Sequence, residues 1–203
     1  AGAGNNNITI SSTANSGEYT SGDGNDIYNI QEGATGNIFI TSGDGIDKFV
    51  VNSSNLFSWQ NSVSINASGD GVKTLNLNQG YVGKFNSGSG DDVITSNSGT
   101  FLGRSGWDIN TGTGNDTITL DGQLDPDANV YLGGGNDNIT INGGIAGHPY
   151  DYSRIYGEEG NDTITVRGDN RTNINLYLGD GNDSFNASAA TNLSGNIFGE
   201  NGD

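Results

Sequence analysis

Residues 133–141 read Gly133-Gly-Gly-Asn-Asp137-Asn-Ile-Thr-Ile141, and this pattern returns along the whole chain. It joins a glycine-rich turn and an aspartate to a short segment in which apolar and polar residues alternate. Successive copies begin about 21 residues apart, which predicts stacked structural units. The residues that align with Asp137 are Asn6, Asp26, Asp47, Lys73, Asp92, Asp116, Asp162 and Asp183.

Two apolar columns accompany the aspartates. The position two residues after each aspartate is apolar in every copy, as in Ile139 and Ile164, with polar residues between, which predicts a half-buried strand. The position seven residues before is apolar in all but the Lys73 copy, where Ile65 lies one place earlier. One such unit cannot bury its apolar side, but stacked units can. We therefore predict an all-β fold, a single parallel β-solenoid over residues 1–203 with about nine to ten coils.

The composition limits the chemistry. The 203 residues include 35 glycines and no cysteine, so we expect no disulfide and no thiolate metal site. A formal net charge of -17 argues against nucleic acid or an anionic membrane as a partner. No apolar run is long enough to span a membrane, and we expect no membrane insertion. The abrupt end at Asn201-Gly202-Asp203 suggests a fragment of a longer protein.

Stacking places the aspartates in a column, where neighbouring carboxylates repel one another. A hard divalent cation between successive turns, bound by carboxylates and backbone carbonyls, would remove this repulsion. Calcium suits an irregular oxygen cage better than magnesium. A single turn of this kind would be interpreted as an ordinary Asp-Gly turn. Several such turns that repeat in phase with the two apolar columns favour a metal site. The candidate calcium ligands are Asp26, Asp47, Asp92, Asp116, Asp137, Asp162 and Asp183.

The turns resemble the repeats-in-toxin (RTX, haemolysin-type) calcium-binding repeats, whose pattern G-G-x-G-x-D-x-U-x is met around Asp137 and Asp162. The resemblance implies a right-handed β-roll, calcium-dependent folding and type I secretion from a Gram-negative bacterium. It also implies that the aligned aspartates are the side-chain ligands. One difference is that only every second turn carries the motif here, which resembles the one-edge calcium solenoids of some giant bacterial adhesins.

Lys73 interrupts the aspartate column between Asp47 and Asp92. Its ammonium could take the place of an ion, so we predict no calcium, or a weakened site, on either side of it. Five adjacent pairs remain, 26/47, 92/116, 116/137, 137/162 and 162/183, and they predict about five or more calcium ions. Five such ions would bring the net charge of -17 to -7.

Alternate coils are longer, and we expect their insertions to share the edge opposite the calcium turns. The insertions carry candidate surface contacts, for which filling of coil corners, a neighbouring domain or subunit, and a glycan are open interpretations. These residues are Trp59, Trp107, His148, Tyr150, Tyr152 and Arg154. No nucleophile and base pair is visible, so we expect no enzyme. A partial threonine ladder that includes Thr95, Thr119 and Thr140 leaves ice binding as an alternative.

These observations predict a structural calcium-binding module of a secreted or cell-surface bacterial protein, such as a surface-layer protein or adhesin. Calcium is scarce in the cytosol, so the chain would stay unfolded until secretion and then fold outside. Copies of itself or neighbouring domains would be its partners in a surface assembly. A secretion appendage of an extracellular enzyme is the competing interpretation.

Overall fold

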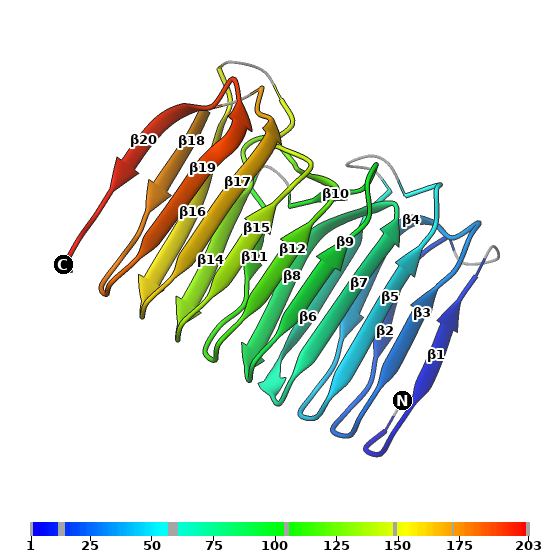
Figure 1. Cartoon of the computed structure of the whole chain (residues 1–203). Coiled ribbons are helices and arrows are strands. Elements are labelled where there is room, and N and C mark those ends of the chain that lie inside the picture. The colour runs from blue at the N-terminus through cyan, green and yellow to red at the C-terminus, as the bar shows by residue number, and fades with distance from the viewer. Residues whose placement is uncertain are drawn as a thin grey trace.

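The computed structural model describes residues 2–11, 15–56, 61–103, 106–147, 150–171 and 173–201. These residues form parallel strands and no helix, and the strands build a β-solenoid (Figure 1). The predicted all-β solenoid is therefore confirmed, with about nine stacked coils of about 21 residues, at the lower end of the expected number.

Two sheets form the walls of the solenoid, and each coil contributes one main strand to each sheet; the short strands β10 (Phe101–Leu102) and β13 (Gln123–Leu124) also pair into sheet 2. Sheet 1 contains the strands that follow the aspartate turns: β1 (Asn7–Ile10), β3 (Ile27–Ile30), β5 (Asp47–Asn52), β7 (Lys73–Gln79), β9 (Val93–Ser96), β12 (Thr117–Leu120), β15 (Asn138–Ile141), β17 (Thr163–Asp169) and β19 (Ser184–Thr191). Sheet 2 contains the strands that precede those turns: β2 (Asn15–Thr20), β4 (Thr35–Thr41), β6 (Val63–Asp70), β8 (Tyr81–Ser89), β11 (Asp108–Asn110), β14 (Asn129–Gly134), β16 (Tyr152–Glu159), β18 (Asn173–Tyr177) and β20 (Ser194–Phe198).

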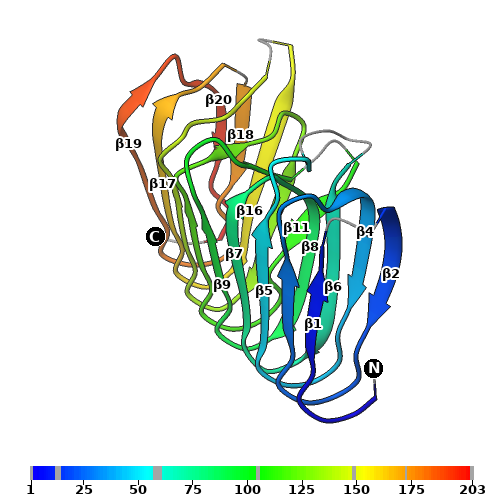
Figure 2. The same ribbon diagram turned by 90° about the vertical axis from the view of Figure 1, so that its right-hand side faces the viewer.

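The turns and the connections lie on opposite edges of the solenoid. The tight glycine-aspartate turns, which lead from sheet 2 to sheet 1, line the lower edge in Figure 1. The connections from sheet 1 back to sheet 2 are longer and line the upper edge, where β10 (Phe101–Leu102) pairs with β13 (Gln123–Leu124). Figure 2, a view turned by 90°, shows both sheets running side by side from the first coil to the last.

The core fills the space between the sheets, because alternate side chains of each strand point inward. Equivalent residues of successive coils stack in register: Ile118 pairs with Ile139, and Ile139 with Ile164, and all three are fully buried. Tyr28 and Phe49 stack inside with ring centroids 5.4 Å apart. Both apolar columns predicted from the sequence therefore form the core.

The irregular Lys73 coil keeps this register by means of a bulge. Ile65 pairs with Ile40 and Phe85, so it occupies the place in the column that the usual spacing would give to Asn66. The register of β6 against β8 shifts between Ala67 and Asp70 and absorbs the extra residue. The apolar column is thus unbroken.

An outward-facing, mostly half-buried aromatic stack on sheet 2 shows the coil spacing directly. Tyr131, Tyr156, Tyr177 and Phe198 occupy one column, and successive ring centroids are 4.7, 4.8 and 4.9 Å apart. These distances match the spacing of about 4.8 Å between neighbouring strands of a sheet.

Candidate metal centre

The predicted aspartate column exists and lies in the interior of the turn edge. The side chains of Asp26, Asp47, Asp92, Asp116, Asp137 and Asp162 are at most 2% exposed, whereas Asp183 near the end of the chain is half-buried. Each lies at or next to the first residue of a sheet 1 strand, so the parallel register places them one above another. Buried carboxylates at this spacing need compensation.

One oxygen of each carboxylate is bonded to the neighbouring coil. The Oδ1 atom of Asp137 accepts a hydrogen bond of 2.7 Å from the backbone N–H of Asp116, and Asp162 accepts one of 2.9 Å from Asp137. Asp47, Asp116 and Asp183 accept equivalent bonds from Asp26, Asp92 and Asp162. All five pairs predicted from the sequence are therefore neighbours in the structure, each joined by a bond of 2.7–2.9 Å.

The second oxygen of these carboxylates lacks a donor. The Oδ2 atoms of Asp26, Asp92, Asp116, Asp137 and Asp162 are buried and make no hydrogen bond within the described part of the chain. A buried charged oxygen without a partner is costly, at about 1–3 kcal/mol or more. The column therefore presents a row of oxygens that either a proton or a cation would satisfy.

Burial governs the acidity of the column. Desolvation raises the pKa of Asp116 and Asp162 to about 6 and that of Asp137 to about 7, although the N–H group bonded to each carboxylate opposes the shift. Charge repulsion from column neighbours, such as Asp116 and Asp162 acting on Asp137, adds to the increase. The pKa of Asp92 is raised by the same desolvation. Without a cation, Asp116, Asp137 and Asp162 therefore bind protons at about pH 6 to 7.

Lys73 shows how a cation fits between two coils. Its side chain is fully buried, and its Nζ atom lies 3.4 Å from the Oδ2 of Asp47, with which Lys73 pairs in register. The same Nζ donates hydrogen bonds of 2.7 Å to the carbonyl of Gly45 and 3.0 Å to the carbonyl of Asp70. The ammonium is thus enclosed by one carboxylate and two carbonyl oxygens from both coils.

The glycine carbonyl in this set recurs in the other turns. In each copy the glycine two residues before the aspartate has a positive φ, +133° at Gly114 and +138° at Gly135. A Cβ placed on Gly135 would lie 1.8 Å from the carbonyl oxygen of Gly114 in the preceding coil. Glycine is required here for both reasons, and its carbonyl oxygen points toward the next coil.

The donor set is therefore oxygen only. The described residues contain no group of three or more His, Cys, Asp or Glu side chains placed to hold a metal, so carbonyl oxygens must supply most ligands of any ion between two coils. Between Asp116 and Asp137, three oxygen atoms are equivalent to those that surround the Lys73 ammonium. They are the Oδ2 of Asp116 and the carbonyl oxygens of Gly114 and Gly134. Carboxylate and carbonyl oxygens suit a hard cation such as calcium.

A second ladder next to the column was not predicted. The residue before each aspartate is usually asparagine, and its Oδ1 accepts a hydrogen bond from the backbone N–H of the next coil, at 2.9 Å from Asn136 to Asn115 and 2.9 Å from Asn161 to Asn136. The aspartate ladder runs in the opposite direction, because the backbone N–H of each aspartate donates to the carboxylate of the next coil along the chain. The recurrence of Asn before Asp in the repeat was the available signal. The two ladders together fix the turn edge.

Four of the six predicted surface contacts belong to the described part of the chain. Trp59 and His148 lie outside the described residues. Trp107 is half-buried just before β11 and packs toward Phe39, with ring centroids 6.4 Å apart. Tyr150 and Tyr152 are exposed near the start of β16, and Arg154 lies within that strand, paired with Asn129 and Asn175 in register.

Comparisons of the chain with protein-family models, with curated proteins and with solved structures give no match. Among the described residues, no helix is long and apolar enough to cross a membrane.

Proposed function

We propose that the chain is a structural calcium-binding module of a secreted or cell-surface protein of a Gram-negative bacterium, such as a surface-layer protein or adhesin of the RTX type. Calcium ions lie between successive coils along the turn edge and bind the carboxylates of the aspartate column together with glycine carbonyls. The module has no catalytic role and serves as a rigid rod that spaces or presents its neighbours.

The environment of Lys73 carries this proposal. At the one interior position where the column has a basic residue, the positive charge lies between two coils and is held by a carboxylate and two carbonyls. The other intervals have the same kind of oxygens and an unpartnered Oδ2, but no side chain that supplies a positive charge. A divalent ion fills this role in the proposal.

The proposed mechanism is thermodynamic. The chain carries a net charge of -17 and little apolar surface, so repulsion opposes folding when no cation is present. Sites of this type bind at the millimolar calcium concentrations found outside cells, and binding free energy becomes folding free energy. The chain therefore passes a type I secretion channel unfolded and folds once it is outside.

Counting the bound ions tests the proposal. Equilibrium dialysis against radioactive calcium is expected to give about five ions per chain, one for each complete pair of aspartates. Excess magnesium is expected to displace few of them, because it requires a regular octahedron. Binding of fewer than two ions at millimolar calcium would contradict the proposal.

A further inference from the structure

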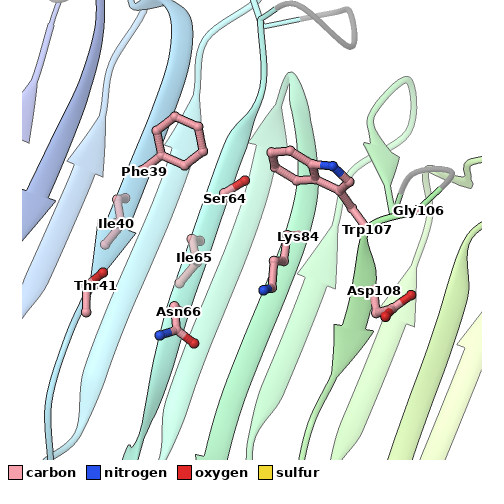
Figure 3. Close-up of a pocket in the computed structure, with 10 residues that line it drawn as sticks. All are labelled: Phe39, Ile40, Thr41, Ser64, Ile65, Asn66, Lys84, Gly106, Trp107 and Asp108. Atoms are coloured by element: carbon pink, nitrogen blue, oxygen red, sulfur yellow. The ribbon is translucent and has the colours of Figure 1, made fainter.

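A hollow of about 350 Å³ lies on the outer face of sheet 2, far from the aspartate turns (Figure 3). Its walls and floor come from β4, β6, β8 and the start of β11. Outward-pointing residues of four successive coils meet there: Phe39, Ser64, Lys84 and the pair Trp107–Asp108. Strands supply most of the hollow, and Gly106 and Trp107 at its border belong to the connection that leads into β11.

Two aromatic rings border this hollow. The Phe39 side chain is 41% exposed on the sheet face, and the Trp107 ring is tilted toward it with an interplanar angle of 37°. The indole lies next to Gly83, where an added Cβ would be in ordinary van der Waals contact with Trp107 Cε3 at 3.5 Å. Figure 3 shows the two rings on either side of Ser64. Paired aromatic rings that keep exposed surface are typical of recognition sites.

The polar groups of the hollow are placed for a ligand with hydroxyl groups. Ser64 is 7% exposed, and its Oγ makes no hydrogen bond with any described residue. The exposed Lys84 has no carboxylate oxygen of the described residues within 4.0 Å of its ammonium. Asp108 accepts a hydrogen bond of 3.1 Å from Asn129, and its second oxygen can accept another. A donor, an acceptor and an unsatisfied hydroxyl therefore surround the rings.

From this geometry we propose that the hollow binds a sugar ring of a neutral polysaccharide. The C–H face of a pyranose packs on the indole of Trp107 and the ring of Phe39, while its hydroxyls bond to Lys84, Asp108 and the Oγ of Ser64. The net charge of -17 repels an acidic polysaccharide, which selects a neutral one. This proposal requires only the folded solenoid and does not depend on which cation stabilises it.

Affinity electrophoresis of the folded protein tests this site. Native gels that contain millimolar calcium are cast with dextran, hydroxyethyl cellulose or galactomannan, and one further gel contains alginate as an anionic polymer. At least one neutral polymer is expected to retard the wild-type chain. Trp107→Ala and Phe39→Ala are each expected to weaken that retardation about tenfold or more, because the ring faces supply most of the contact.

Tyr152→Ala is the matched control, because it removes an exposed aromatic side chain of sheet 2 outside the hollow. It is expected to be retarded like the wild type. Circular dichroism of each variant verifies that the solenoid is intact. Three results would each overturn the proposal. The first is that no neutral polymer alters the migration of the protein, and the second is that alginate alone retards it. The third is that folded W107A, folded F39A and the wild type are retarded equally.

Discussion

The Nζ of Lys73 lies 3.4 Å from the Oδ2 of Asp47, and both side chains are completely buried. A buried pair of this kind contributes little net stability, but loss of one partner leaves an uncompensated charge. In each of the five aspartate pairs the earlier carboxylate has an Oδ2 without a partner, and the ion pairs of the described residues place no ammonium beside it. In the proposal, the ammonium of Lys73 takes the place of an ion between two calcium-binding segments of the turn edge.

Lys73→Asp should convert the interrupted column into a continuous one. The new carboxylate can accept the N–H of Asp47, which now donates to the carbonyl of Val72 at 3.0 Å. We expect about two additional calcium ions per chain, one in each interval beside residue 73, and a higher calcium concentration for half-maximal folding than in the wild type, because one more carboxylate repels the column. Equilibrium dialysis and a calcium titration of the strand signal measure these two effects. If the variant folds but binds no additional calcium, the two intervals beside residue 73 are not equivalent to the other aspartate pairs.

Asp137→Asn tests the role of a single carboxylate. The amide oxygen still accepts the N–H of Asp116, but the charge that faces two intervals is lost. We expect about two fewer calcium ions and, in chelator at pH 7.5, more strand signal in circular dichroism than the wild type retains, because a buried charge is removed. Asp121→Asn is the control, since Asp121 is exposed and lies outside the column. If D121N and D137N lose the same number of ions, the column is not the binding site.

The metal-free protein should become more stable as the pH falls. The pKa values of Asp116 and Asp162 are raised to about 6 and that of Asp137 to about 7, above their ordinary value of 3.8, so the folded state binds protons more tightly than the unfolded state. Stability is therefore highest below about pH 4 for these groups, and it is lost as the pH rises through 6 to 7. Circular dichroism in chelator from pH 4.5 to pH 8, with thermal melts wherever the chain is folded, measures this trend. A strand signal that grows as the pH rises over this range would contradict it.

The glycine turn allows a matched pair of alanine variants. Gly135→Ala places a Cβ 1.8 Å from the carbonyl oxygen of Gly114 at a φ of +138°, whereas Gly134→Ala meets only Thr113 Cγ2 at 3.8 Å. We expect G135A to lose about 3 kcal/mol or more, which lowers the melting temperature by roughly 6–12 °C, and to bind calcium more weakly. G134A should be close to the wild type in calcium-saturated thermal melts. If both variants lost a similar amount of stability, the close approach of the Gly114 carbonyl to residue 135 would not be the cause of the loss in G135A.

The sequence was sufficient to predict the stacking of the coils. The recurrence of Asp137 and its equivalents, with Ile139 and Val130 at fixed offsets, gave the column, the core and the two edges, because a repeat confines each position to one column. The position of Lys73 in the column could be predicted in the same way. Its contacts with Gly45 and Asp70 could not, because they depend on the path of a long flexible side chain.

The contact between Phe39 and Trp107 left no periodic signal. These two side chains approach each other across the coils of Ser64 and Lys84, and only the structure shows this approach. The sequence also could not predict that the two oxygens of each carboxylate differ. One oxygen accepts a hydrogen bond from a backbone N–H, and the other has no partner among the described residues. This difference depends on the rotation of a side chain and not on spacing.

Circular dichroism and size-exclusion chromatography with and without a calcium chelator test the central claim most directly. We expect EGTA at pH 7.5 to abolish the strand signal and expand the chain, and excess calcium to restore a compact β-solenoid. A chain that keeps its strand signal, its elution volume and its melting temperature after complete removal of calcium would contradict the claim that ions between the coils hold the fold together.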